Sequence, residues 1–397
     1  MENPKPTYPL EGVVVLDLSQ IYNGPYATYL MAVAGATVIK IEPPGGESLR
    51  RRGVVGGAGL PFAMLNGCKE SIVLNLKTEE GKHALRELAK TADVLVENFS
   101  PGVMERLGLG ADELQKLNPG LIYASSSGYG RDGPYKEYPA MDLTVQAMGG
   151  IIDSTGFPDS PPVKSGPAIA DFFAGTHFYG AILTALYDRE HNGKARRVEV
   201  SMQDAVYASL SSNLGLHWSS AGKDIPPRTG NRHGGLAESP YNVYPSSDGY
   251  VAIICVTEGH WRALTTLMGQ PELADDPRFS TLKERVSRMD LIDSTVAAWT
   301  SQHPKEWLVK QMLAVRVPSA PVRTLDEVVN DPNMHARGAL QWQDHPDYGR
   351  IVVQQSPIRF DGLPPFPLEP SHRLGADTEK VLRERLGMSD EEIEKLL

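Results

Sequence analysis

The stretch VVVLDLSQIYNGPYATYLMAVAGATVIKIEP, residues 13–43, decides the fold of the first part of the chain. Its opening run, VVVLDLS, is short, β-branched and apolar, which predicts a buried strand. YATYLMAVAG has helical character and ends at Gly35, a suitable C-cap residue. ATVIKIEP then predicts a second strand that ends at Pro43 and Pro44. Together they form a βαβ unit, which requires the two strands to pair in parallel.

The same alternation continues outward from this unit. Strands are predicted at SIVLNLK, ADVLVENF and LIYASSSGYG, and helices at TEEGKHALRELAKT and ADELQKLN. Beyond Asp171, apolar residues recur at helical spacing, and RRVEVSM predicts a further strand. Strands that alternate with helices in this way predict an α/β protein with a doubly wound, Rossmann-like parallel sheet.

The later part of the chain predicts a smaller α+β unit. AGKDIPPRTGNRHGGLAESP is rich in Gly and Pro, and YNVYPSSDGYVAIICV predicts two strands around a Ser-Ser-Asp-Gly turn. Amphipathic helices follow to about residue 330, and the Pro-rich tail predicts an extended wrap before a final helix. We therefore expect a large domain (1–200 and 335–397) whose parallel sheet is built from both chain ends, a linker at 201–224 and a small domain at 225–334.

Composition excludes several classes of partner and location. A net charge of -10 over 397 residues argues against nucleic acid and anionic membranes, although it leaves room for small anionic ligands. Cys68 and Cys255 are too few for a disulfide framework or a structural zinc site. The N-terminal MENPKPTYPLEG has no targeting pattern, and no apolar run approaches the roughly 20 residues of a membrane span. A cytoplasmic protein is expected.

Three common chemistries lack their motifs. The first strand–helix turn reads QIYNGPYA, without the G-x-G-x-x-G that brings a backbone close to a dinucleotide pyrophosphate. The ten histidines contain no H-E-x-x-H and no clustered ligand spacing, and SSSGYG is not the G-x-S-x-G of serine hydrolases. Neither a metal nor a redox cofactor is therefore expected.

The stretch SGPAIADFFAG, residues 165–175, places the carboxylate of Asp171 among apolar and small residues. If a helix begins just after it, Asp171 suits an N-cap. The same position suits a nucleophile, because unpaired N–H groups and the helix dipole would hold the carboxylate ionised. Small neighbours leave room for a substrate: Gly166, Ala170, Ala174 and Gly175. Spacing alone leaves both interpretations open.

Blocks along nearly the whole chain resemble the class III (family III) CoA-transferases. They are residues 10–46, LNGCKESIVLNLKTEEG, ENFSPGVMERLGL, LNPGLIYASSSGYGRDGPY, the stretch around Asp171 and LGADTEKVLRERLGMSDEEI. The resemblance implies that Asp171 attacks the thioester of a donor acyl-CoA and forms a mixed anhydride. The CoA thiolate then attacks back to give an aspartyl-CoA thioester, and an acceptor carboxylate collects the CoA by the same two steps in reverse. CoA would be a co-substrate.

The resemblance also implies a CoA-binding set. The matching positions are Ile21, Leu74, Lys77, Asn98, Phe99 and Arg106. A lysine and an arginine suit the phosphate charges of CoA. Some relatives have an arginine where this chain has Pro43, so the nucleotide end is expected to be held differently, with help from Arg50, Arg51 or Arg52.

The Gly-rich GNRHGG segment matches the family's mobile loop over the active site, although a plain interdomain linker would have the same composition. The lid residues are Gly230, Asn231, Arg232, His233, Gly234 and Gly235. Arg232 and His233 would meet the carboxylate of the acceptor, which favours a dicarboxylic acid. Succinyl-CoA as the donor and a small dicarboxylic acid as the acceptor are the expected substrates.

Two alternatives to CoA transfer follow from the same resemblance. The α-methylacyl-CoA racemases share the fold and the aspartate, but they pair it with a histidine in a G-H-D segment. This chain has Met141 in that place, and methionine cannot accept a proton. A non-catalytic CoA-binding protein is the other alternative. The resemblance further implies an intertwined homodimer.

Overall fold

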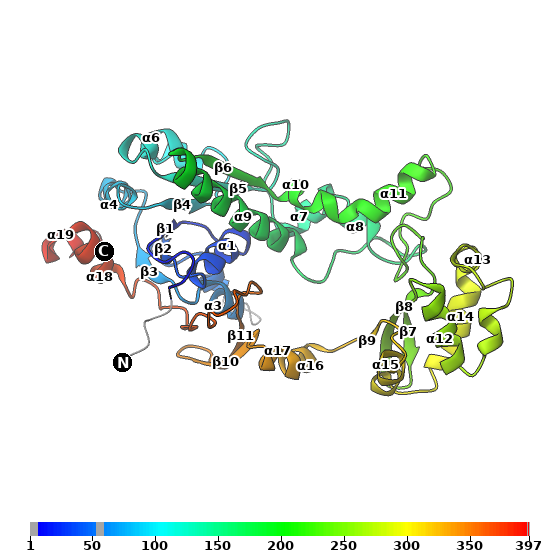
Figure 1. The fold of residues 1–397 in the computed structure, drawn as a ribbon. Helices are drawn as coiled ribbons and strands as arrows, with labels where there is room; N and C mark the ends of the chain where they lie inside the picture. The colour runs from blue at the N-terminus through cyan, green and yellow to red at the C-terminus, as the bar shows by residue number, and fades with distance from the viewer. Residues whose placement is uncertain (1–6, 53–58, 395, 397) are drawn as a thin grey trace. The chain divides into compact units, whose positions relative to one another are not determined.

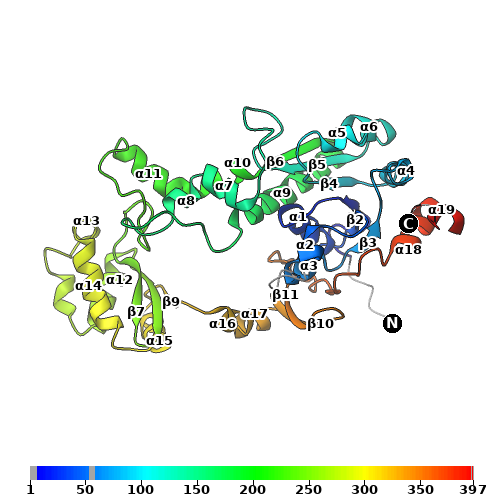
Figure 2. The same ribbon diagram turned by 180° about the vertical axis from the view of Figure 1, so that it is seen from behind.

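The computed structural model describes residues 7–52, 59–394 and 396, and the chain divides into two compact units (Figures 1 and 2). Unit 1 consists of residues 1–145, 167–206 and 331–397, and unit 2 of residues 146–166 and 207–330. The proposed domain division at 200, 225 and 335 stays a prediction. The segment predicted as a linker, 201–224, contains the helices α10 (Met202–Tyr207) and α11 (Ser211–Ser219).

A six-stranded sheet with all neighbours parallel forms the centre of unit 1. Its order is β3-β2-β1-β4-β5-β6, which is the doubly wound Rossmann order and confirms the predicted fold class. The strands are β1 (Val14–Asp17), β2 (Thr37–Glu42), β3 (Glu70–Val73), β4 (Val94–Glu97), β5 (Ile122–Ser127) and β6 (Arg197–Ser201). The prediction that both chain ends build this sheet was wrong, because all six strands precede residue 202. The C-terminal part of the chain contributes helices, an extended segment and a separate two-stranded sheet instead.

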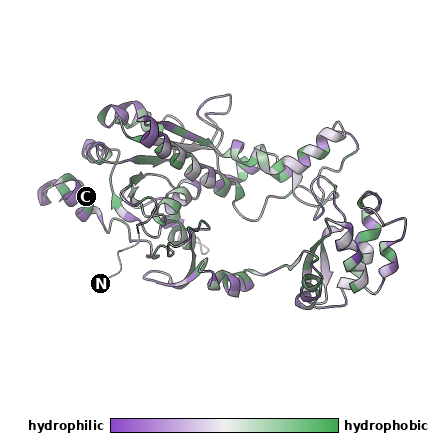
Figure 3. Cartoon of the chain, viewed as in Figure 1, coloured by the Kyte–Doolittle hydropathy of each residue, from purple (hydrophilic) through white to green (hydrophobic). Residues whose placement is uncertain are grey.

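The two faces of this sheet bury different sets of side chains, because successive residues of a strand point to opposite sides. Val15 faces the core under α1 (Asn23–Ala32) and α9 (Ile169–Asn192), while Leu16 faces the core under α4 (Glu79–Ala89), α6 (Ala111–Leu117) and α18 (Thr378–Leu386). Hydrophobic residues accordingly run along these strands in Figure 3. Apolar runs covered on both faces are typical of parallel sheets.

Helix α9 also carries Asp171. Among the described residues it is the one helix whose length, 24 residues, and mean hydropathy, 1.2, would allow it to cross a membrane. Half of the apolar 18-residue stretch of α9 that meets this criterion is buried in the protein. The helix packs on α1, β5 and β6. These contacts identify α9 as a core helix.

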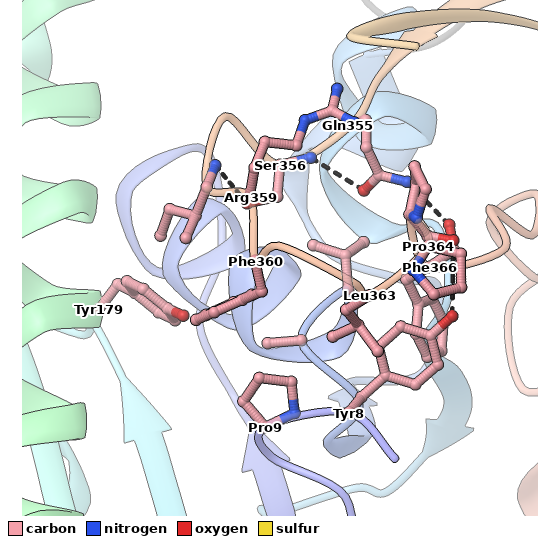
Figure 4. A pocket seen from close by; sticks show the side chains of 14 residues that line it. Tyr8, Pro9, Tyr179, Gln355, Ser356, Arg359, Phe360, Leu363, Pro364 and Phe366 are labelled. Carbon is pink, nitrogen blue, oxygen red and sulfur yellow. Dashed lines mark hydrogen bonds between the residues drawn. The ribbon is translucent and has the colours of Figure 1, made fainter. Parts of the chain in front are cut away.

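The predicted C-terminal wrap is present between β11 (Gly349–Gln354) and α18, where residues 355–377 contain neither helix nor strand. Figure 4 shows part of it beside the N-terminal segment: the Tyr8 and Phe366 rings meet edge to face at 4.9 Å, and Gln355 Nε2 donates to Phe366 O at 2.7 Å. The cavity in Figure 4 has about 40 Å³. That is space for little more than water, so we interpret it as a packing gap.

The end of the wrap covers an open edge of the parallel sheet. β3 is the edge strand, and its Ser71 N–H donates to Asp377 Oδ2 at 2.7 Å. The Val73 N–H donates to Thr378 Oγ1 at 3.0 Å. Satisfied edge groups cannot pair with another chain, which protects the edge from aggregation.

Unit 2 has a separate core under a three-stranded antiparallel sheet of β7 (Tyr241–Ser246), β8 (Gly249–Ile254) and β9 (Ser319–Pro321). This arrangement confirms the predicted smaller α+β unit. Its larger helices are α12 (Glu258–Leu267), α14 (Met289–Thr300) and α15 (Lys305–Ala314).

The remaining elements of the chain are α2 (Ser48–Arg52), α3 (Leu60–Asn66), α5 (Val103–Arg106), α7 (Asp142–Met148), α8 (Ile151–Ser154), η1 (Ala208–Leu210), η2 (Pro271–Ala274), α13 (Leu282–Val286), α16 (Leu325–Val329), α17 (Pro332–Ala336), β10 (Leu340–His345) and α19 (Asp390–Glu394).

Candidate active site

Asp171 lies inside the first turn of α9, not before it. The helix begins at Ile169, and Ala168 is the N-cap residue without a side-chain bond. Asp142, the first residue of α7, supplies the cap instead: its Oδ1 accepts the N–H of Ala170 at 2.9 Å and of Asp171 at 3.3 Å. The N-cap interpretation of Asp171 is therefore wrong. The cap from Asp142 leaves the carboxylate of Asp171 available for other chemistry.

The surroundings of Asp171 bring the pKa of its carboxyl group close to neutral pH. Its residue is 6% exposed, and burial together with the negative charge of Asp142 raises the pKa of Asp171 from 3.8 to about 7. A backbone hydrogen bond from Asn23 partly offsets this rise. The helix end was expected to favour the ionised form, and desolvation opposes that effect. Raised basicity makes an ionised carboxylate a stronger nucleophile.

Helix α1 packs closely against the turn that carries Asp171. A side chain at Gly175 would place its Cβ 2.7 Å from Asn23 O, so only glycine permits this approach. The ring of Phe172 stacks on Tyr22 at 6.0 Å and meets Tyr26 edge-on at 5.1 Å. These contacts form an aromatic cluster at the start of α9, and burial together with the charge of Asp171 raises the pKa of Tyr22.

Asn98 fixes the turn between β1 and α1, which the sequence did not foresee. Its Oδ1 accepts the Gln20 N–H at 2.8 Å, and its Nδ2 donates to Gln20 O at 2.8 Å and to Asn23 Oδ1 at 2.7 Å. Both polar atoms of the Asn98 side chain thus hold the protein's own turn. The structure gives this predicted CoA contact a positioning role as well.

A buried charge cluster supports the same turn from inside the sheet. Asp17 Oδ2 receives hydrogen bonds from Lys69 Nζ at 3.0 Å and Thr28 Oγ1 at 2.6 Å, and Lys40 Nζ lies 3.8 Å from Asp17 Oδ1. Burial opposes ionisation, but Lys40 and Lys69 hold the pKa of Asp17 well below its usual range. Burial lowers the pKa of Lys69 to about 8. The cluster anchors the start of the turn that ends beside Asp171.

A cavity of about 280 Å³ opens on the other side of this turn. It is lined mainly by apolar side chains from the ends of β1 to β4, with a few polar groups between them. The lining residues are Leu18, Ser19, Gln20, Ile41, Glu42, Pro43, Glu47, Leu74, Asn75, Leu76, Lys77, Phe99, Val103 and Leu107. The carboxyl ends of the strands are where ligands bind in open α/β sheets.

The structure brings three residues of the predicted CoA-binding set, Leu74, Lys77 and Phe99, to this cavity. Ile21, whose φ is 68°, and Asn98 lie in and against the turn that borders it. Arg106 is exposed in α5, between the lining residues Val103 and Leu107.

Two of the three arginines expected to help hold the nucleotide end, Arg50 and Arg51, have other partners. Arg50 donates to Glu42 with both Nε and Nη2, at 2.8 and 2.8 Å, and lies 3.9 Å over the Phe62 ring. Arg51 donates to Gly46 O at 2.9 Å. Pro43 lines the cavity itself and gives it an apolar wall.

The predicted lid, residues 230–235, belongs to unit 2, and its role over Asp171 stays a prediction. Arg232 is engaged there by Asp290 at 2.6 Å and Asp293 at 2.7 Å. His233 Nδ1 accepts the Gly235 N–H at 3.2 Å. Asn231 lines a separate cavity on the face of β7 and β8, Gly230 has a φ of 63°, and Gly234 closely approaches Asn213. An acceptor carboxylate would have to displace an existing partner of Arg232.

Comparison with protein families gives a match over residues 10–378 to the model described as CoA-transferase family III. The chain is 40% identical to the acetyl-CoA:oxalate CoA-transferase of Acetobacter aceti, over 94% of this chain and 93% of that protein. It is 36% identical to the formyl-CoA:oxalate CoA-transferase of Streptomyces coelicolor, over 98% and 97%. It is 35% identical to the succinyl-CoA–D-citramalate CoA-transferase of Chloroflexus aurantiacus, over 100% and 98%.

Solved structures resemble the chain over a similar extent. A CAIB/BAIF family protein from Brucella suis superimposes with a TM-score of 0.83 at 34% identity, covering 96% of this chain and all of that one. A protein from Mycobacterium tuberculosis gives a TM-score of 0.82 at 30% identity, covering 94% and 99%. The likeness therefore extends through the sheet, the turn beside Asp171 and the small unit alike.

Proposed function

Since the chain belongs to CoA-transferase family III and transfers CoA to a carboxylic acid, we propose that Asp171 carries this transfer as a covalent nucleophile. The observation that carries the proposal is the state of its carboxylate: buried, relieved of helix capping by Asp142, and raised in pKa to about 7. A group in this state is basic enough to attack a thioester and still partly ionised at neutral pH.

The proposed reaction needs no net proton, oxidant or metal. A carboxylate oxygen of Asp171 attacks the acyl carbon of the donor, the C–S bond breaks, and CoA leaves as a thiolate. The thiolate attacks the Asp171 carbonyl carbon of the mixed anhydride, the C–O bond to the donor acyl group breaks, and the donor acid leaves as a carboxylate. An acceptor carboxylate then displaces CoA from Asp171, and the thiolate attacks the acceptor carbonyl to regenerate the free Asp171 carboxylate. Covalent catalysis divides one difficult exchange into easier steps.

Both intermediates hydrolyse in water, so the nucleophile needs shelter. The close packing of α1 on α9 at Gly175 and the rings of Tyr22, Tyr26 and Phe172 supply apolar cover beside Asp171. We propose that the GNRHGG segment adds further cover as a lid. Glycines give such a loop the backbone freedom to open and close.

We propose that the cavity beside the β1–α1 turn receives the nucleotide end of CoA. Leu74, Phe99 and Pro43 offer apolar surface there, and Lys77 offers a positive charge. Arg106 is proposed as a second partner for the phosphates, because its guanidinium is exposed near the cavity. One turn of chain, held by Asn98, separates this cavity from Asp171.

A small dicarboxylic acid is the proposed acceptor and succinyl-CoA the proposed donor. Oxalate and citramalate, which occur in the names of the relatives above, are both dicarboxylic acids. The racemase alternative gains no support, because Met141 is 54% exposed and has no acid–base group. A non-catalytic role is excluded by membership among the CoA-transferases.

We also propose an intertwined homodimer in the cytoplasm. Large side chains on the outer face of α9, Phe173 and Tyr187, are 39% and 65% exposed. Exposed apolar groups on a long core helix suit a contact with a second copy.

A substrate panel tests the proposal. The enzyme is incubated with succinyl-, acetyl- or formyl-CoA and with oxalate, succinate, glutarate, citramalate or a monocarboxylic control, and the CoA esters formed are identified by mass spectrometry. We expect the new ester of a dicarboxylic acid, in amounts that match the loss of donor. Transfer to monocarboxylic acids alone would contradict the acceptor assignment, and free CoA without any new ester would contradict transfer itself.

A further inference from the structure

Glu47, which lines the cavity beside the β1–α1 turn, has one side-chain oxygen without a hydrogen-bond donor among the described residues. The residue is 4% exposed. Oε2 accepts the Leu49 N–H at 3.0 Å and the Ile21 N–H at 3.4 Å. Oε1 is buried and has no hydrogen-bond partner within the described part of the chain.

This orphan oxygen is unusual for its surroundings. Glu42 lines the same cavity, and both of its oxygens are bonded to Arg50. A buried acceptor left without a donor costs free energy, more so when it carries charge, and native proteins retain few such groups. An oxygen that gains its donor only when a ligand enters the cavity explains why this one is retained.

The chemistry of a carboxylate restricts which ligand group meets it. An ionised carboxylate accepts hydrogen bonds and donates none, and it repels phosphate. The cavity holds about 280 Å³, near the lower end for small-molecule sites, so it accommodates part of CoA and not all of it. Apolar side chains form most of its walls: Leu18, Ile41, Leu74, Phe99, Val103 and Leu107. Such walls suit a flat base that carries an amine at its edge.

We infer that Glu47 Oε1 accepts a hydrogen bond from bound CoA, and that the donor is the exocyclic amine of adenine. The inference rests on the proposed function, because it requires the nucleotide end of CoA in this cavity. Glu47 would then select for adenine, while Lys77 and Arg106 act on phosphate charge alone.

Glu47→Gln tests this with little change of shape. The two backbone N–H groups of Leu49 and Ile21 require an acceptor at the Oε2 position, so the glutamine oxygen takes that place. The amide nitrogen of the glutamine then occupies the former Oε1 position. There its N–H groups face the adenine amine, which is itself a hydrogen-bond donor. The dissociation constant of CoA is expected to rise about tenfold or more, which is the effect of losing a charge-assisted hydrogen bond.

The ligand is varied in the same titrations. Deamino-CoA, with hypoxanthine in place of adenine, presents a carbonyl oxygen where CoA has the amine. Wild-type enzyme is expected to bind CoA more tightly than deamino-CoA, and Glu47→Gln is expected to reverse that preference. With an S-acyl pantetheine substrate, which lacks the nucleotide, wild type and variant should have equal kcat/KM.

Glu70→Gln is the matched control. Glu70 also has one buried oxygen without a partner and one bonded to Lys380 at 2.9 Å, but it does not line the cavity. Its substitution should leave both preferences unchanged. A general loss of folding in Glu47→Gln would lower the Tm and affect pantetheine and CoA substrates equally.

The outcomes separate this inference from the proposed function. Equal CoA affinity of wild type and Glu47→Gln, with CoA transfer intact, overturns the role of Glu47 and leaves the role of Asp171 standing. If the pantetheine substrate loses as much as CoA does while the Tm of Glu47→Gln equals that of wild type, the donor is not on the nucleotide and the adenine assignment is overturned. If Glu47→Gln does not fold, the wild-type enzyme alone decides: equal affinities for CoA and deamino-CoA overturn the adenine assignment. Failure of wild type to bind CoA at all contradicts the proposed function first.

Discussion

Asp171→Asn is expected to reduce CoA transfer by about 10³-fold or more, because the amide cannot form the mixed anhydride on which every later step depends. The loss should appear in kcat, with any donor in the panel. Glu190→Gln, an exposed substitution on the same helix, is the control and should retain full activity. Initial rates of ester formation, followed by chromatography, give the comparison. Retention of more than a tenth of the activity by Asp171→Asn would contradict a covalent role.

The same variant should be folded and at least as stable as wild type above neutral pH. The folded-state pKa of Asp171 is raised from 3.8 to about 7, so the native state binds more protons than the unfolded state between these values. Ionisation of the buried carboxylate therefore costs stability as the pH rises through this window, on the order of 4 kcal/mol at most. The amide escapes this cost. Thermal unfolding at pH 5 and pH 8 should show the advantage of Asp171→Asn growing with pH, and a large loss of Tm at pH 8 would indicate a structural defect.

The activity of the wild-type enzyme should fall on the acidic side of neutrality. Only the ionised carboxylate attacks, and its pKa in the free enzyme is about 7, so kcat/KM should decline about tenfold per pH unit below that value. An acid limb near the ordinary carboxyl pKa of 3.8 would contradict the environment described here.

Asp142→Asn should move this limb to lower pH. The asparagine oxygen can still accept the N–H groups of Ala170 and Asp171, but the negative charge that raises the pKa of Asp171 is gone. Asp142→Ala removes the charge and the cap together. Loss of the cap should lower the free energy of unfolding by about 1 kcal/mol, and with it the Tm. The pH profile of kcat/KM for the two variants separates the effects. An unchanged limb in Asp142→Asn would show that burial alone sets the pKa of Asp171.

The central sheet was predictable because its strands are continuous apolar runs between helix signals. VVVLDLS, ATVIKIEP and ADVLVENF are covered on both faces, so their composition alone identifies them. The hairpin of β10 and β11 was missed, since LQWQDH mixes polar and apolar residues without a clear period. Its pairing depends on long-range contacts that a local pattern does not contain.

The site was predictable to the extent that single residues are distinctive. Asp171 stands out as a charge among apolar neighbours. The family resemblance pointed to Leu74, Lys77 and Phe99, which the structure brings to one cavity, and their contact with CoA stays a prediction. Asp142 was missed, because a cap that comes from another helix has no sequence spacing to reveal it. The buried Lys69 and the orphan oxygen of Glu47 were missed because lysine and glutamate are usually exposed, and only the folded chain buries them.

Peptide mass spectrometry can show whether Asp171 becomes acylated during turnover. Wild-type enzyme is mixed with donor acyl-CoA without an acceptor, quenched with hydroxylamine and digested. We expect a hydroxamate on the Asp171 peptide, formed from either the anhydride or the aspartyl-CoA thioester, and none in Asp171→Asn or without donor. Full turnover by an enzyme whose Asp171 peptide stays unmodified under these conditions would contradict it.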